Sequence, residues 1–414
     1  MINEIGQKLY LNCLLLWLMC AHTLLVGCAD RDDIFRVSED KGQPKFVSDS
    51  VRNPLRNAYF GDVHVHSRYS FDASLFGVLV TPDEAYRFAK GSPLRHASGQ
   101  TMILSQPLDF FSVTDHAGLL GGLLSFSEMD PKKGNEIIPL TKEVSKCWEN
   151  GCDFSPISSP SLSANAWDAL RNFSRGLQAS RVGRGVLDNR QVLGDSWQSI
   201  VEASERHNDP NNFTTFIGYE YTAISPTNGN LHRNVLFRSS AVPELPFSMF
   251  DSQNPEDLWH WMDSLRESGI DSLAIPHNSN GSDGWMFQMT QYDGSPQNAE
   301  YAEQRMRNEP IVENTQIKGT SDTHPSLSPH DDWADFEVMP YLVGRHGFSE
   351  IRGSYARHAL GRGLKQDNEL GFNPFKFGFI GSSDTHTAAS SQEEDNFFSK
   401  IGILDSSASL RGSI

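Results

Sequence analysis

Apolar, β-prone runs that end on a histidine or a carboxylate recur along this chain. In the first, residues 61–67, His64 and His66 stand two residues apart after the apolar pair Tyr59 and Phe60. Because successive side chains of a strand alternate between its faces, Asp62, His64 and His66 would project from one side. Later runs end in the same way, on Asp115 and His116, on Glu220, on His277, and on Asp384 and His386.

Helical patterns separate these runs. Residues 81–89 carry a helix start, with Thr81 as the cap, Pro82 at the first position and two acids after it. Residues 255–268 and 349–365 have helical patterns as well. Strands and helices that alternate, with polar groups at the carboxyl ends of the strands, are typical of a barrel-like α/β fold with its active site at that end.

Length and charge limit the classes of function that the chain can have. The 414 residues are 38% hydrophobic, which is enough to bury the core of one large or two ordinary domains. The formal net charge of −17 argues against a nucleic-acid partner, because phosphate neutralisation needs clustered Lys and Arg. Divalent cations held by Asp, Glu and His would instead create local positive charge for an anionic substrate.

The N-terminus has the pattern of a targeting segment. Residues 14–26 form an apolar run that is short for a membrane span, and the sequence Leu25-Val26-Gly27-Cys28 ends it. This ending resembles the lipobox of bacterial lipoproteins. The resemblance implies a signal peptide over residues 1–27, a lipidated Cys28, a polar tether to residue 55, and anchoring to the periplasmic side of the cell envelope, with outer-membrane sorting favoured. An ordinary signal peptide or an uncleaved anchor are the alternatives.

Residues 119–212 separate the second strand end from the third. They are rich in Ser, Asn and Gly and have helix-like stretches at 167–173 and 195–205, so we expect a partly helical insertion over the active-site mouth. A surface elaboration without function is the alternative. Cys147 and Cys152 lie here, and outside the cytoplasm they would pair as a disulfide. Free thiols or half of a zinc site remain open.

The ordered motifs His-x-His, Thr-Asp-His, Gly-Tyr-Glu, Pro-His and Asp-x-His resemble the metal motifs of the PHP (polymerase and histidinol phosphatase) superfamily. More closely, residues 59–403 resemble domain-of-unknown-function family 3604. The phrases that carry this finer match are residues 61–66, 83–88, 216–220, 231–235 and 379–386. The resemblance implies that residues 56–414 form a distorted (β/α)7 barrel with two or three divalent metal ions, and that the chain stops short of the usual family C-terminus.

Site residues follow from the same resemblance. Asp62 and Asp115 are expected to orient imidazoles as part of the catalytic site. Ser321-Asp322-Thr323-His324 nearly repeats the last motif, but only the later copy leaves an apolar strand run, so His324 is assigned to the rim of the site. The metal ligands implied by the resemblance are His64, His66, Asp72, His116, Glu220, His232, His277, Asp384 and His386. Imidazole and carboxylate ligands without thiolate suit zinc, manganese or iron.

We therefore predict an envelope-anchored, metal-dependent hydrolase, in the first instance a phosphoesterase of small phosphorylated substrates that uses a metal-bridging hydroxide. Arg233, next to His232, is the predicted phosphate clamp, with Arg68 as a second candidate. Two alternatives stay open. The same metal site could hydrolyse another bond, such as a non-phosphate ester or an amide, or the chain could be a truncated, inactive metal-binding envelope protein.

Overall fold

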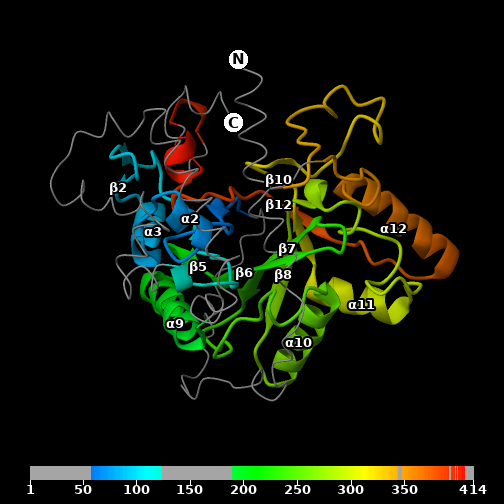
Figure 1. Cartoon of the computed structure of the whole chain (residues 1–414), viewed down its shortest axis with the longest axis horizontal. Helices are drawn as coiled ribbons and strands as arrows, with labels where there is room; N and C mark the ends of the chain where they lie inside the picture. Colours follow the sequence, from blue (N-terminus) through cyan, green and yellow to red (C-terminus); the bar gives the residue numbers. More distant parts are fainter. Residues whose placement is uncertain are drawn as a thin grey trace, which may run out of the picture. The chain divides into compact units, whose positions relative to one another are not determined.

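The computed structural model describes residues 57–123, 189–343, 347–390, 393–396, 398 and 400–405. The chain divides into two compact units (Figure 1). Of these described residues, 57–123, 189–218 and those from 383 onward belong to the first unit, and 219–343 and 347–382 belong to the second unit. The predictions for the signal peptide, the tether, Cys28, Cys147, Cys152 and the helix at 167–173 lie outside the described residues.

A short parallel sheet organises the first unit. Its strands are β1 (Gly61–Asp62), β4 (Phe110–Phe111) and β5 (Thr214–Thr215), in the order β1-β4-β5. A Cβ at Gly61 would lie 2.2 Å from the carbonyl oxygen of Phe110, so only glycine allows β1 to approach β4 this closely. This sheet brings the first and second strand ends of the sequence side by side.

Helices pack against this sheet. The remaining elements of the unit include α2 (Phe71–Leu75), α3 (Pro82–Ala89), β2 (Leu94–Arg95), β3 (Thr101–Met102) and α9 (Arg190–His207). The helix start predicted at Thr81 is confirmed, because Thr81 and Glu84 form a reciprocal capping box. Helix α9 contains the helix predicted at 195–205 and packs on α3, where Arg206 and His207 contact Asp83.

The second unit contains an antiparallel strand pair and a separate parallel pair. Its strands are β6 (Ile217–Ile224, which starts at the end of the first unit), β7 (Asn230–Phe237), β8 (Ser272–Pro276), β9 (Ile311–Glu313), β10 (Thr315–Gln316), β11 (Gly319–Thr320) and β12 (Gly378–Ile380). The sheet order is β6-β7-β8, with β7 antiparallel to β8, while β12 pairs in parallel with β9. The antiparallel pairs mean that the strands do not all run in the same direction.

The α-helices that the structure describes in this unit are α10 (Pro255–Glu267), α11 (Ala299–Asn308) and α12 (Ala356–Leu370) (Figure 1). Helices α10 and α11 pack on β8 and on each other. The prediction for residues 255–268 is confirmed, with Asn254 as the cap. Helix α12 starts at Ala356 rather than at residue 349, because Gly353 has a φ of +86° and its carbonyl accepts a hydrogen bond from Phe287.

One expectation about the strands needs correction. Glu220 lies inside β6 rather than at a strand end, and His232 lies inside β7. The described strands form a mixed α/β arrangement of separate sheets, and none of these sheets closes into a barrel. Among the described helices, none has the length and apolar character needed to cross a lipid bilayer.

Candidate functional site

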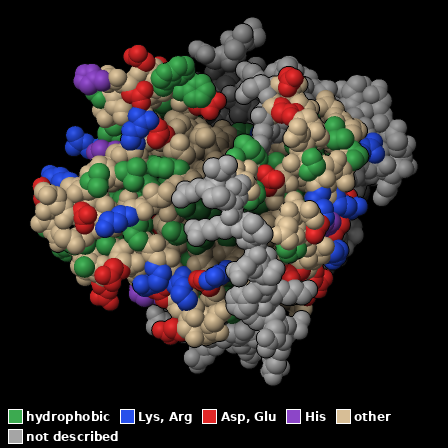
Figure 2. All heavy atoms as spheres, turned by 180° about the vertical axis from the view of Figure 1, so that it is seen from behind, with side chains coloured by type: hydrophobic (Ala, Val, Ile, Leu, Met, Phe, Trp, Pro, Cys, Tyr) green, Lys and Arg blue, Asp and Glu red, His purple; other side chains and the backbone are tan. Residues whose placement is uncertain are grey.

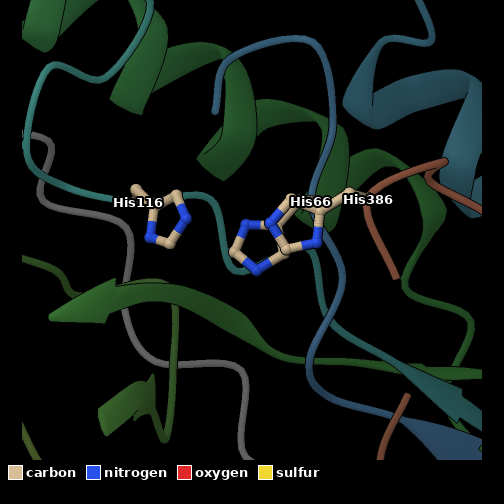
Figure 3. A group of neighbouring side chains, drawn as sticks. All are labelled: His66, His116 and His386. Atoms are coloured by element: carbon tan, nitrogen blue, oxygen red, sulfur yellow. The ribbon is translucent and has the colours of Figure 1, made fainter. Parts of the chain in front are cut away.

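Three buried imidazoles meet in the first unit. His66 follows β1, His116 follows β4, and His386 lies in the segment that contacts β1 from the far end of the sequence. The backbone N–H of His66 donates to the carbonyl of Thr385 at 2.9 Å, which places His66 beside His386. Their ring centroids are 4.1 Å apart, and those of His66 and His116 are 4.5 Å apart (Figure 3). One nitrogen from each ring lies within 4.8 Å of the other two.

Two carboxylates complete this group, which we call the first cluster. Asp384 Oδ1 lies 3.2 Å from both His64 Nε2 and His66 Nε2. Asp72 Oδ2 lies 2.9 Å from His386 Nε2 and 3.2 Å from His116 Nε2. Ligand atoms about 2.1 Å from a shared ion would be about 3.0 to 3.4 Å apart in octahedral or tetrahedral geometry. The donor set and its spacing therefore fit a divalent ion.

Charge within the cluster favours ionised carboxylate. Burial opposes ionisation of Asp72, but the charges of His386 and His116 and their hydrogen bonds hold its pKa well below the ordinary value.

Asp384 has a left-handed backbone, with φ of +53°, a conformation that is uncommon outside glycine. Strained ligand positions of this kind concentrate at functional sites, where surrounding contacts hold them in place.

Hydrogen bonds determine which nitrogen two of the imidazoles present to the cluster. Ser70 Oγ donates to Asp115 Oδ1 at 2.7 Å, so it must accept from His66 Nδ1–H, which lies 2.8 Å away. His386 Nδ1 lies 3.0 Å from the carbonyl oxygen of Asp384, which can only accept. Both rings therefore carry a proton on Nδ1 and direct Nε2 at the carboxylates, and in the neutral ring Nε2 has a lone pair that can bind an ion.

Asp115 and Asp62 act on the cluster through other groups. Asp115 accepts hydrogen bonds from the backbone and side chains of Ser67 and Ser70, at 2.6 to 3.1 Å. Asp62 accepts a hydrogen bond from the backbone N–H of His64 at 3.1 Å. It also accepts hydrogen bonds from both the backbone N–H and the Oγ of Ser383. Through these hydrogen bonds each carboxylate positions the backbone that carries the ligands.

A second cluster lies in the second unit. Glu220 Oε1 is 2.7 Å from His232 Nδ1 and 3.3 Å from His277 Nε2, and all three side chains are buried. The antiparallel register explains this meeting, because Arg233 pairs with Pro276 and the N–H of His277 donates to the His232 carbonyl. A carboxylate oxygen of Glu313 also lies within 4.8 Å of a His277 nitrogen.

Arg233 lies elsewhere than predicted. It is adjacent to His232 in β7, so the two side chains point to opposite faces of the strand. Its guanidinium is 2.8 Å from Glu309 Oε1 and donates to the carbonyl of Leu231 at 2.6 Å. Arg305 and Trp259 bind the same Glu309 carboxylate. Arg233 is therefore engaged in a buried ion-pair network rather than presented to Glu220 and His232.

The near-repeat at Asp322 has a different environment from the motif at Asp384. Asp322 pairs with Arg357, and His324 Nδ1 lies 2.8 Å from Ser326 Oγ with its ring against Tyr355.

Arg68, the second candidate for a clamp, lies on the loop between β1 and α2 and is partly buried. Its role stays a prediction.

Two residues were missed by the sequence reasoning. Glu313 ends the short apolar strand β9, so it has the same strand-end pattern that selected the other ligands. Ser70 had no comparable signal, because a serine four residues after His66 is common in a polar loop. Only the fold, which brings Asp115 to the same hydroxyl, distinguishes Ser70 from the neighbouring serines.

Comparison with known proteins gives one result. No curated protein and no solved structure matches the chain. The family model described as "Protein of unknown function (DUF3604)" matches residues 53–413, which include both clusters and the segments around them. The chain belongs to the DUF3604 family.

Proposed function

We propose that the protein is a metal-dependent hydrolase of small anionic esters, with phosphoric esters as the first substrate class. The observation that carries this proposal is the pair of carboxylate oxygens, one on Asp384 and one on Asp72, that each face two imidazole nitrogens. A divalent ion bound there would act as a Lewis acid and lower the pKa of coordinated water toward about 7. Zinc, manganese and iron all accept such mixed nitrogen and oxygen ligands.

The chain's own residues would prepare each cluster for an ion. Ser70 and the carbonyl of Asp384 hold the rings of His66 and His386 with Nε2 directed at the carboxylates. Burial of His66, His386 and Asp384 limits competition from water and strengthens the electrostatic interactions of these side chains. In the second cluster, Glu220 would bind an ion together with His232 and His277, and Glu313 would be a further carboxylate ligand.

The proposal extends to fold and location. It includes the distorted (β/α)7 barrel of the PHP superfamily and anchoring to the cell envelope through a lipid on Cys28, both of which rest on sequence resemblance. That all nine predicted ligands share one centre also stays a prediction. Hydrolysis of other esters or of amides uses the same chemistry and is an outcome of the experiment below.

The first test is the metal content of the purified full-length protein after gel filtration, followed by hydrolysis assays. We expect at least two equivalents of zinc, manganese or iron, one for each cluster, and turnover of phosphate monoesters or diesters with the bound metal. His66→Ala and His277→Ala should each lose metal and activity. His330→Ala, which removes an exposed histidine outside both clusters, is the matched control.

Two results would refute the proposal. One is a folded protein that retains less than about one equivalent of metal after reconstitution, since ligands in a formed site bind tightly. The other is full turnover in both the His66→Ala and His277→Ala variants. Turnover of carboxylic esters or amides but not of phosphoric esters would keep the hydrolase and change the substrate class.

A further inference from the structure

A pocket of about 590 Å³ in the second unit has no part in either cluster. Its lining includes Gly284, from the segment that follows β8, and Arg352, which lies just before helix α12. His358 and Arg362 are four residues apart on α12, so both side chains lie on one face of the helix and line the pocket. No ligand of the second cluster lines it.

All charged side chains that line this pocket are basic, namely Arg352, His358 and Arg362. In the part of the chain that the structure describes, neither guanidinium forms an ion pair, and the buried Nδ1 of His358 has no hydrogen-bond partner. Arg357, the neighbour of His358 on the same helix, pairs with both Asp322 and Asp331. Within the described residues, the pocket therefore holds basic groups whose charge no ion pair neutralises.

The electrostatics of these groups agree with this description. Burial, and then the charge of Arg352, lowers the pKa of Arg362. Burial also lowers the pKa of His358, with further contributions from Arg362 and Arg352. The chain as a whole has a net charge of −17, and basic side chains stand among acidic ones on the face shown in Figure 2. Uncompensated basic groups in one cavity of an acidic protein would favour an anion.

The backbone on both sides of the pocket is held in place. Ser354 Oγ accepts the N–H of Gly284 at 2.8 Å, and Asp283 Oδ1 accepts the N–H of Glu350 at 2.9 Å. Gly284 and Gly353 both have positive φ, and a Cβ on Gly353 would lie 2.3 Å from the Gly284 carbonyl oxygen. The two loops therefore pack backbone to backbone, which fixes the start of the Arg352 side chain before any ligand arrives.

We propose that this pocket is a binding site for a small organic oxyanion, a phosphate, phosphonate or sulfate. The anionic group contacts Arg352 and Arg362, because guanidinium forks match the oxygen atoms of such groups. The carbon part packs against Met289 and Leu327, and Gln288 and Ser326 supply polar contacts. This site is separate from the proposed hydrolytic function and does not require it.

The test is titration calorimetry on the full-length protein at constant ionic strength, with phenylphosphonate, methylphosphonate, inorganic phosphate and inorganic sulfate as probes. Phenylphosphonate has no ester bond to hydrolyse, so binding is measured without turnover. We expect it to bind more tightly than methylphosphonate, because its ring contacts Met289 and Leu327. Comparison of phosphate with sulfate identifies which oxyanion the pocket prefers.

Variants assign the binding to this pocket. Arg352→Gln with Arg362→Gln should weaken phenylphosphonate binding at least about tenfold, since each removes a charge-assisted contact. Lys365→Gln removes one exposed positive charge from the same helix and should change affinity less than about twofold. His66→Ala and His277→Ala should leave binding intact, which separates this site from the clusters.

Loss of binding in His66→Ala or His277→Ala, with normal binding in the double arginine variant, would overturn the proposal. Absence of saturable binding of all four probes to the wild-type protein would overturn it too. If the double variant does not fold, the single arginine variants replace it in the binding measurement. Arg352 is exposed, so its substitution is tolerated more readily than that of a core residue.

Discussion

The Nδ1 atom of His66 lies 2.8 Å from Ser70 Oγ, a hydroxyl that in turn donates to Asp115. The two hydrogen bonds fix the tautomer and the orientation of a ring whose Nε2 faces Asp384 Oδ1 at 3.2 Å. Partners of this kind raise the basicity of a ligating imidazole and limit its rotation. Ser70 is therefore a positioning residue for the first cluster, and its removal has consequences that differ from the loss of a ligand.

Ser70→Ala should weaken metal binding by about 10- to 100-fold while the protein stays folded, because the ring of His66 loses its hydrogen-bond acceptor. Competition with a chromophoric chelator measures this affinity. Ser70→Thr keeps the hydroxyl and should restore most of it. Equal metal affinities for Ser70→Ala and the wild-type protein would contradict the positioning role.

Glu313→Gln tests whether the second cluster has a ligand beyond the three named from sequence. Glutamine keeps the shape of the side chain and removes its charge, so metal affinity should fall at least about tenfold if Glu313 binds the ion. The exposed Glu303→Gln is the matched control, with the same chemical change on the surface of α11. An unchanged metal content with both substitutions would exclude Glu313 as a ligand.

Glu309→Gln should lower the free energy of unfolding by about 3 to 5 kcal/mol, because it leaves two buried arginines, Arg233 and Arg305, without their carboxylate. Burial opposes ionisation of Glu309, but these arginines hold its pKa below the ordinary value, so the ion pairs persist at neutral pH. Urea denaturation of the metal-free protein measures the loss. A loss below about 1 kcal/mol would mean that the network contributes little.

His96 should make stability fall in mild acid. Burial lowers its pKa from 6.5 to about 4, against the opposing effect of a hydrogen bond with Gly402. The unfolded chain therefore binds a proton between pH 6.5 and 4 that the folded protein does not. The free energy of unfolding is therefore unaffected by this group above pH 6.5 and decreases as the pH falls toward 4. The total decrease is roughly 3 kcal/mol.

The substitution His96→Asn isolates this contribution. The backbone N–H of Ser98 donates a hydrogen bond to His96 Nδ1 at 3.0 Å, and the side-chain oxygen of asparagine can accept the same bond. The difference in unfolding free energy between wild type and variant, measured by urea denaturation at pH 8, 6, 5 and 4, should shrink or reverse toward acid. A difference that stays constant over this range would show that His96 titrates alike in both states.

Local sequence signals predicted the elements that short-range interactions form. The Thr81 cap with Glu84 three residues later defines the start of α3, and Asn254 followed by Pro255 starts α10. The fixed φ of proline and the hydrogen bond from cap to backbone both act within one helical turn. These features can therefore be read without knowledge of the fold.

The strand-end pattern correctly identified residues that lie close together. For some of them, however, the cause is an antiparallel strand pairing that the pattern did not predict. His66, His116 and His386 come together through parallel contacts near strand ends, as expected. His232 meets His277 because β7 is antiparallel to β8, which brings the start of one strand to the end of the other. Strand direction depends on long-range pairing, and a single strand's sequence does not encode it.

By itself, the sequence determined the chemical types and the local spacing of the candidate ligands, because alternation along a strand and capping at a helix start are local properties of the chain. The tertiary structure alone decided which partners these side chains have. It directs Arg233 to Glu309 instead of to His232, brings Ser70 to Asp115, and places Arg352 and Arg362 in the lining of one pocket. These outcomes depend on contacts between residues far apart in the chain, which only the packed fold establishes.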